Sequence, residues 1–333
     1  MRLIKISVLA GVSLSLFACG GGGSSGGGSN GDGGNTNVLG AQWTNQIGSA
    51  SGVSGTDNIS LEPVSNTIYR LNQNRSTLCT ISASANSATP WNCSSVSVMN
   101  GFPSGYTIYS QNLVPDGSGN MYTIGMNASS QYFLLKYNGT SWSSVILSNV
   151  PSNINFVITY YYNGYIYGLT SSSLGNSNQY NLVAFDPVTG NHNSANTINS
   201  VYTGVSVPTS NSSVIMNNTF YVNNVTNIQA TSLINTSNVT TYRGETVSSS
   251  ISATTSNLYA CGPISGYTGT GINATSLSNP SGWQNVGYTY SLNVSGYNVY
   301  AGCYSMYAST NRVFVVGYVS NSAGNNDAAV FTQ

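Results

Sequence analysis

The 333-residue sequence predicts an all-β fold, and three observations lead to that expectation. From residue 39 onward, no long stretch repeats apolar residues with the helical period of 3.6. β-branched and aromatic residues instead alternate with short runs of Ser, Asn and Gly, which is typical of short strands joined by turns. A similar aromatic segment also returns six times along the chain, and such a repeat predicts an architecture of repeated units.

Each repeat begins with a turn residue followed by an apolar and aromatic strand, as in "NTIYRL" and "GYIYGL". One aromatic residue marks each of these strands, and the markers lie 38 to 55 residues apart: Tyr69, Tyr122, Tyr167, Tyr221, Tyr259 and Phe314. A second marker follows each of the first five by 20 to 25 residues: Trp91, Trp142, His192, Tyr242 and Trp283. Periods of this length indicate a propeller, a solenoid or an array.

We expect a six-bladed β-propeller of four-stranded antiparallel blades. The sixth repeat reaches the end of the chain in "DAAVFTQ", which reads as its third strand. The fourth strand of this blade is found at the other end of the domain, in "GAQWTNQIG". The N-terminal strand around Trp43 is therefore predicted to join the C-terminal blade and close the ring, which hides the edges of the sheets.

The hairpins of two repeats resemble those of known propeller families. "LVAFDPVTGNH" resembles the outer hairpin of the kelch repeat, in which Phe185, Asp186, Pro187 and Thr189 match and His192 stands at the usual Trp position. "PDGSGNMY" resembles the Asp-x-x-Gly-Asn-x-Tyr hairpin of other propeller repeats. The chain departs from kelch units in carrying single glycines after the second strand, where kelch units carry a pair: Gly125, Gly168, Gly262 and Gly317. The resemblance implies a kelch-like propeller and no particular activity.

Residues 1–18 are predicted to be a signal peptide, with Arg2 and Lys5 before an apolar run that is too short to span a membrane. The end of this run, "LFAC", resembles the bacterial lipobox, and that resemblance implies cleavage before Cys19 and lipidation of its thiol and amine. An ordinary secretory signal is the alternative. Residues 19–38 read as the lipidated cysteine and a flexible Gly/Ser tether, and residues 39–333 read as the propeller domain. Gly20 after the cysteine favours the outer membrane of the cell envelope as the location.

With Cys19 assigned to the anchor, four cysteines remain for disulfides in an oxidising compartment. Cys79 and Cys93 fall on neighbouring antiparallel strands of the first unit, which predicts one bond. Cys261 and Cys303 fall on strands of adjacent units, which predicts a second. Buried free thiols are the alternative. The chain has no Cys-x-x-Cys pair and one histidine, so we expect no metal site.

Charged residues make up only 4% of the chain, with seven Lys+Arg and seven Asp+Glu. Nucleic-acid binding needs clustered basic residues, and the five basic residues after position 18 are scattered, so we expect no nucleic-acid partner. "GTGINA" formally matches a dinucleotide fingerprint but has no helix after it, so we expect no cofactor. "DGSGN" offers one carboxylate, which is few for a calcium site.

Catalytic candidates are correspondingly few. Asp116, Asp186 and Asp327 fit turn positions, whereas Glu62 is predicted on the first strand of the first unit, where it would line the central channel. Asp57 and Glu245 are the other carboxylates left without a turn role. A glycosidase needs two carboxylates about 5–9 Å apart, and Glu62 with Glu245 would form such a pair only by accident of folding. His192 occupies the position of a structural aromatic residue, which argues against a catalytic triad.

The 24 tyrosines are the remaining signal, and "ITYYYNGYIYG" is the densest cluster. Tyrosine is common at recognition surfaces, so Tyr160 and Tyr162 join Glu62 as candidate ligand contacts, with packing between blades as the alternative role. We therefore expect a monomeric lipid-anchored binding module for a protein or glycan ligand, without catalytic activity. An extracytoplasmic carbohydrate-active enzyme using a channel carboxylate, and a purely structural envelope protein, are the alternatives.

Overall fold

The computed structural model describes residues 45–49, 58–148, 150, 156–171, 179–202, 213–224, 227–235, 239–243, 251–263, 270–287, 293–294, 297–308, 313–321 and 326–332. All of its regular elements are β-strands apart from one short 3₁₀ turn, η1 (Val96–Val98), which confirms the all-β expectation. In this part of the chain, no helix has the length and apolar character needed to cross a membrane. Residues 38–333 form one compact unit.

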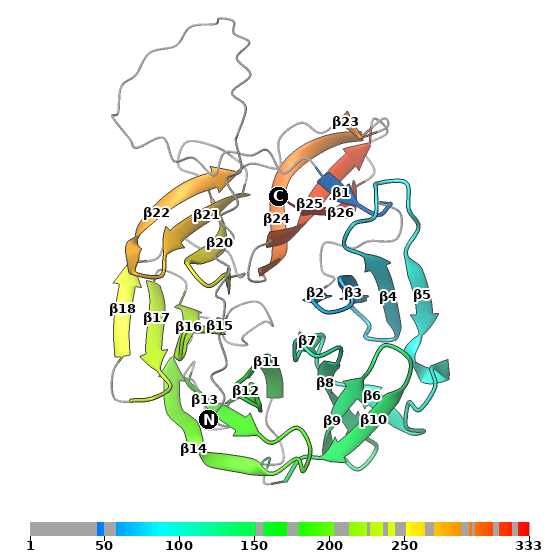
Figure 1. The fold of residues 1–333 in the computed structure, drawn as a ribbon, viewed down its shortest axis with the longest axis vertical. Helices are drawn as coiled ribbons and strands as arrows, with labels where there is room; N and C mark the ends of the chain where they lie inside the picture. The colour runs from blue at the N-terminus through cyan, green and yellow to red at the C-terminus, as the bar shows by residue number, and fades with distance from the viewer. Residues whose placement is uncertain are drawn as a thin grey trace, which may run out of the picture. The chain divides into compact units, whose positions relative to one another are not determined.

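The strands form antiparallel sheets that follow one another along the chain (Figure 1). The first sheet has the order β2 (Asn58–Glu62), β3 (Thr67–Leu71), β4 (Thr77–Ser82) and β5 (Asn92–Ser95). The second has the order β10 (Trp142–Ile146), β9 (Tyr132–Tyr137) and β8 (Met121–Asn127), and β8 also pairs with both β6 (Tyr106–Ile108) and β7 (Val114–Pro115). The third has the order β11 (Phe156–Tyr162), β12 (Tyr165–Ser171), β13 (Gln179–Phe185) and β14 (His192–Tyr202).

The second half of the chain repeats this arrangement. The fourth sheet has the order β15 (Ser213–Met216), β16 (Thr219–Asn224), β17 (Asn227–Ser232) and β18 (Val239–Arg243). The fifth has the order β19 (Ile251–Ala253), β20 (Asn257–Pro263), β21 (Thr270–Ser276) and β22 (Asn279–Gly287). The last has the order β1 (Asn45–Ile47), β26 (Asn326–Thr332), β25 (Val313–Asn321), β24 (Tyr297–Ala308) and β23 (Asn293–Val294).

The sheets are the blades of a β-propeller. The innermost strands contact one another in sequence order: β2 with β7, β7 with β11, β11 with β15, β15 with β19, and β19 with β24. β24 also contacts β2. The N-terminal strand β1 pairs antiparallel with β26, with Ile47 opposite Val330. Trp43, which the sequence places in this strand, lies outside the described residues. After β1, the backbone N–H groups of Gly48 and Ser49 donate to carbonyl oxygens of the first sheet's outer loop, at 3.1 and 2.9 Å.

The repeat markers explain how the blades pack. Every marker of the first set lies in the strand that pairs with the innermost strand of its sheet. All are almost fully buried, between 1% exposed (Phe314) and 6% exposed (Tyr221). The core is divided into apolar clusters, each of which joins two successive sheets, as Leu71, Met121 and Leu135 do. A blade buries both faces of its middle strands in this way, so these strands read as nearly continuous apolar runs.

Local turn chemistry also follows the sequence. Asn163 and Gly164 join β11 to β12 with positive φ of 48° and 83°, as the predicted two-residue Asn-Gly turn requires. The carboxylate of Asp116 accepts hydrogen bonds from the backbone N–H groups of Ser118 and Asn120, and the Asp186 carboxylate does the same for the turn before β14. The predicted turn roles of Asp116 and Asp186 are therefore confirmed. The turn position predicted for Asp327 was wrong, because this residue lies in β26 and pairs with Val319 of β25.

Candidate binding cavity

A cavity of about 240 Å³ lies between the innermost strands of the sheets. Its lining comes from every sheet: residues in or next to β2, β7, β11, β15, β19 and β24 all border it. These strands contact one another, so the cavity is formed by several blades together.

The lining combines apolar and aromatic side chains with polar ones, which include Asn58, Asn112 and Ser252. Ile59, Leu113, Met216, Ile251 and Met306 supply apolar surface from five different sheets. Three tyrosines complete it: Tyr160, Tyr161 and Tyr307. Mostly apolar walls with a few polar groups are the usual composition of a small-molecule site.

One carboxylate, Asp116, borders the cavity among the described residues, and its own turn holds it. One oxygen accepts from the N–H groups of Ser118 and Asn120 at 2.8 and 3.1 Å, and the other accepts from the side-chain amide of Asn120 at 2.7 Å. The oxygens of this carboxylate are therefore engaged within the turn.

The structure places Glu62 differently from the sequence prediction. It lies on the innermost strand of the first sheet, as predicted, but it is fully buried and does not border the cavity. Its oxygens accept hydrogen bonds from the backbone N–H groups of Val64, Ser65 and Gly119, at 3.1, 2.6 and 3.0 Å. The expectation of a channel-lining carboxylate was wrong because the turn after β2 folds its N–H groups over the side chain. A ligand contact by Glu62 stays a prediction.

The two tyrosines predicted as ligand contacts separate in the structure. Tyr160 borders the cavity, and burial raises the pKa of its phenol. Tyr162 is absent from the lining, and its hydroxyl exchanges hydrogen bonds with the backbone N–H and side-chain oxygen of Asn218, both at 2.9 Å. Tyr162 thereby connects the third sheet to the fourth.

Tyr307 and Ser213 were not among the predicted contacts, yet both border the cavity. Each lies on the strand of its sheet nearest the centre, β24 and β15. Tyr307 also falls in the second tyrosine-rich stretch, "YNVYAGCYSMY". Combining strand position with that stretch could have identified Tyr307. A single serine in a serine-rich chain gives no such signal.

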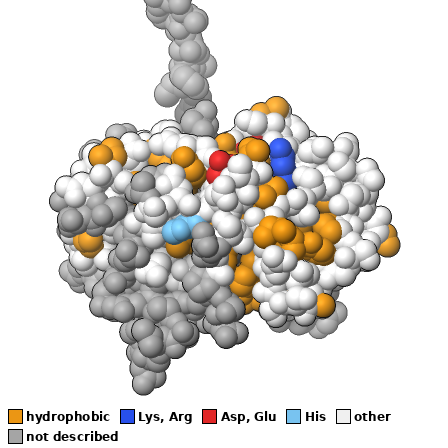
Figure 2. Space-filling model, turned by 90° about the horizontal axis from the view of Figure 1, so that it is seen from below, with side chains coloured by type: hydrophobic (Ala, Val, Ile, Leu, Met, Phe, Trp, Pro, Cys, Tyr) orange, Lys and Arg blue, Asp and Glu red, His pale blue; other side chains and the backbone are white. Residues whose placement is uncertain are grey.

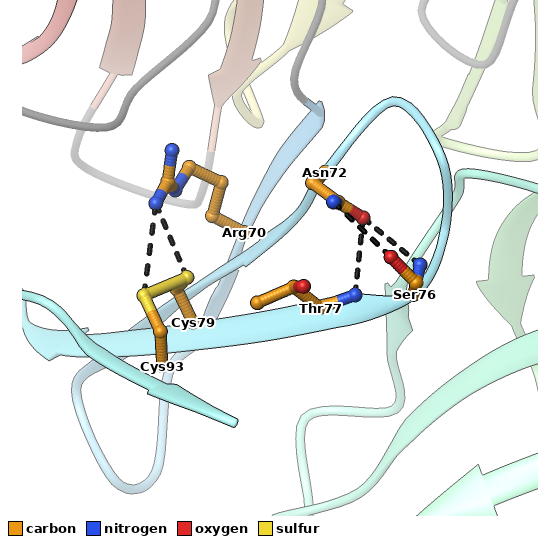
Figure 3. Close-up of a disulfide and its surroundings, with 6 residues drawn as sticks. All are labelled: Arg70, Asn72, Ser76, Thr77, Cys79 and Cys93. Atoms are coloured by element: carbon orange, nitrogen blue, oxygen red, sulfur yellow. Dashed lines mark hydrogen bonds between the residues drawn. A yellow bond between two sulfur atoms is a disulfide. The ribbon is translucent and has the colours of Figure 1, made fainter. Parts of the chain in front are cut away.

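The predicted disulfide between Cys79 and Cys93 is present, and it joins the paired strands β4 and β5 (Figure 3). The Arg70 side chain reaches toward it, with Nη2 at 3.1 Å from the Cys79 sulfur and the guanidinium carbon 5.0 Å from the centre of the Trp91 ring. For the second predicted pair, the side chains of Cys261 and Cys303 lie outside the described part of the structure, although their strands β20 and β24 contact each other. Cys19 also lies outside it.

The other candidates for chemistry are either engaged elsewhere or not described. His192 begins the outer strand β14, and its Nε2 lies 2.8 Å from the Thr197 hydroxyl. Asp57 and Glu245 lie outside the described residues. Within the described ranges, no three His, Cys, Asp or Glu residues group as a metal site would need. The face in Figure 2 shows a few isolated charged side chains among apolar and uncharged polar ones.

No protein-family model and no curated protein matches this chain. Solved structures do share its fold. A protein of unknown function from Bacteroides thetaiotaomicron VPI-5482 is similar with a TM-score of 0.51 and 12% identity, over 87% of this chain and 75% of that one. A luciferin-regenerating enzyme is similar with a TM-score of 0.50 and 11% identity, over 85% of this chain and 93% of that one. At such identities the likeness concerns the fold alone, so the class is β-propeller and function has to be argued from the cavity.

Proposed function

We propose that this protein is a non-catalytic binding propeller whose ligand occupies the central cavity. The observation that carries the proposal is the composition of the lining, which is apolar and tyrosine-rich and draws on every sheet. An enzyme acting on carbohydrate would need converging carboxylates there. The described lining offers Asp116, which is held by three donors of its own turn.

We also propose that the ring consists of six kelch-like blades and is closed by β1. The pairing of β1 with β26 supports closure, as do the contacts that return from β24 to β2. The six successive sheets and their aromatic markers support the blade count. The kelch-like assignment rests on the Asp186 hairpin, in which the backbone N–H groups of Val188 and Thr189 donate to the Asp186 carboxylate, as in a tight turn.

The cellular setting is a further part of the proposal. Lipidation of Cys19 would anchor the chain in the outer membrane, and residues 19–38 would tether a monomeric domain to it. The signal-like residues 1–18 support this setting, and so does the disulfide, since disulfides persist in oxidising compartments.

The test is a ligand screen with the mature protein purified in detergent. Ligand-detected NMR and calorimetry would be run against neutral sugars, sugar acids, amino acids and envelope fragments, and each bound compound would be followed for conversion. We expect binding without conversion. Met216 borders the cavity, so Met216→Trp should fill it and block binding, whereas Val188→Trp on an exposed outer turn should not.

Conversion of a bound sugar would support the enzyme alternative. A complete lack of binding would support the alternative of a purely structural envelope protein. Binding that Met216→Trp leaves unchanged would place the ligand elsewhere and overturn the cavity as the site.

A further inference from the structure

Three hydroxyl groups from three different sheets border the cavity without a hydrogen bond to the described protein. The first belongs to Ser213 at the start of β15, which is 5% exposed. Its Oγ is buried and has no partner in the described part of the structure. Buried hydroxyls in folded proteins are nearly always paired with protein, water or ligand, so this oxygen points to a guest in the cavity.

The other two hydroxyls are the phenols of Tyr160 on β11 and Tyr307 on β24. Burial raises the pKa of both groups, and the electrostatic effects of Tyr160 and Glu62 raise the pKa of Tyr307 further. No hydrogen bond contributes to either shift. Both phenols stay protonated at physiological pH and can donate as well as accept.

Other tyrosines of the ring differ in this respect. The Tyr162 hydroxyl is bonded to Asn218, and the Tyr137 hydroxyl donates to the Gly139 carbonyl at 2.8 Å. The fold therefore supplies hydrogen-bond partners to these two tyrosine hydroxyls, which pack between or beside blades. It leaves Tyr160 and Tyr307 available where they face the cavity.

The charged group in the described lining is the Asp116 carboxylate, whose oxygens accept hydrogen bonds within their own turn. The described basic residues lie elsewhere: Arg70 against the disulfide, Arg75 on the Tyr109 carbonyl, and Lys136 over the Tyr122 ring at 5.9 Å. An anionic ligand would be desolvated beside a carboxylate and without a basic partner, which strongly disfavours its binding.

We propose that the cavity binds one neutral polyhydroxylated ring, of the size and chemistry of a neutral monosaccharide, through the hydroxyls of Tyr160, Tyr307 and Ser213. Sugar hydroxyls donate and accept as these side chains do, and the C–H faces of a sugar ring fit the apolar and aromatic walls. The volume of 240 Å³ lies below the range of about 300–1,000 Å³ for drug-sized ligands, which favours a single ring. This inference rests on the proposed function and adds the ligand class.

The test measures binding of D-glucose, D-galactose, D-mannose and N-acetyl-D-glucosamine to the mature protein by calorimetry and saturation-transfer NMR. D-glucuronate and D-glucosamine serve as charged analogues. We expect at least one neutral sugar to bind, and the anionic D-glucuronate to bind at least about tenfold more weakly. Tyr160→Phe, Tyr307→Phe and Ser213→Ala each remove one hydroxyl with little change of shape, and each should weaken binding about three- to tenfold.

Tyr162→Phe is the matched control, because it makes the same change two residues from Tyr160 and outside the lining. It should lower the melting temperature, since it breaks the bonds to Asn218, and leave sugar affinity unchanged. Tyr160→Phe and Tyr307→Phe should show the opposite pattern, with an unchanged melting temperature and reduced affinity. This crossed pattern separates recognition from folding.

The other outcomes are equally informative. If a charged or purely apolar compound occupies the cavity and the three hydroxyl variants bind it normally, the ligand class is wrong while the proposed binding function stands. If neutral sugars bind and the hydroxyl variants bind them equally well, the three hydroxyls are not the recognition groups. If no sugar binds and the wider screen also fails, water alone occupies the cavity, and both proposals are overturned.

Discussion

The carboxylate of Glu62 accepts a hydrogen bond of 3.0 Å from the backbone N–H of Gly119, which lies 57 residues further along the chain in the neighbouring sheet. The same carboxylate accepts from Val64 and Ser65 in its own turn. One buried side chain thus holds the β2–β3 turn of the first sheet against the β7–β8 turn of the second. This position gives Glu62 a structural role.

Glu62→Gln should therefore lower the free energy of unfolding and leave ligand binding intact. The amide keeps one accepting oxygen but turns an N–H₂ group toward backbone donors. Hydrogen bonds to a charged group contribute about 1.5–3 kcal/mol, so we expect a loss of about 2 kcal/mol. Urea unfolding monitored by tryptophan fluorescence measures the change. Unchanged stability together with lost binding would instead support the original expectation of a ligand contact.

Asp186 provides a pH-dependent comparison. Hydrogen bonds from the backbone N–H groups of Val188 and Thr189 hold the pKa of this carboxyl below its ordinary value of 3.8. Its contribution to stability is thus fully present above pH 3.8 and is lost as the pH falls through the lower value of the folded state. Asp186→Asn should be slightly less stable than the parent at pH 7 and equally stable near pH 2. Because the turn is solvated, the difference at pH 7 should stay below about 1 kcal/mol.

The disulfide between Cys79 and Cys93 should contribute measurably to stability. It closes a loop with a sequence separation of 14, for which the chain-entropy estimate is about 3 kcal/mol. The double variant Cys79→Ser/Cys93→Ser should lose about 2–3 kcal/mol in urea unfolding without reductant. An equal stability of parent and variant would show that the bond does not constrain the unfolded chain.

The same variant tests the second predicted disulfide. If Cys261 and Cys303 are bonded, the Cys79→Ser/Cys93→Ser protein should still lose stability on addition of dithiothreitol. That remaining sensitivity should disappear when Cys261 and Cys303 are also replaced by serine. Thiol titration of the denatured, unreduced parent counts the free cysteines independently. Four reactive thiols among the cysteines of residues 39–333 would contradict both bonds.

Gly190 and Gly164 form a matched pair for the packing of neighbouring blades. Both have positive φ, 71° and 83°. A Cβ on Gly190 would lie 2.0 Å from the carbonyl oxygen of Ile146 in the next sheet, whereas a Cβ on Gly164 would meet nothing within 4 Å. Gly164→Ala should cost about 1–2 kcal/mol from backbone strain. Gly190→Ala adds the clash and should cost about 3–5 kcal/mol. Similar losses in both would show that the two sheets can separate at this turn.

The anchor is tested at Cys19. Cells that express the full chain with Cys19→Ser should release it from the membrane fraction and show no incorporation of labelled fatty acid. The parent should incorporate label and sediment with outer membranes after density separation. Serine at Cys79 and Cys93 is the control, since it removes cysteines without touching the lipobox-like segment. Label on the Cys19→Ser chain would contradict lipidation at this residue.

The sequence by itself determined the propeller class, the strand positions of the aromatic markers, the Asn163–Gly164 turn and the pairing of Cys79 with Cys93. These features depend on local patterns, namely alternation, turn residues and the register of adjacent strands, which are readable within one repeat. Tertiary structure decided the rest. The sequence predicted that Glu62 would line the channel. In the structure its carboxylate accepts a hydrogen bond from a turn 57 residues away, which no local pattern indicates.

The same distinction holds for the cavity. Tyr160 and Tyr162 are nearly equivalent in sequence, yet one faces the centre and the other bonds to Asn218 in the next sheet. Ser213 borders the cavity only because the fold places β15 beside β11 and β19. A side chain in a propeller meets partners from neighbouring blades, and those contacts exist only after the ring has assembled.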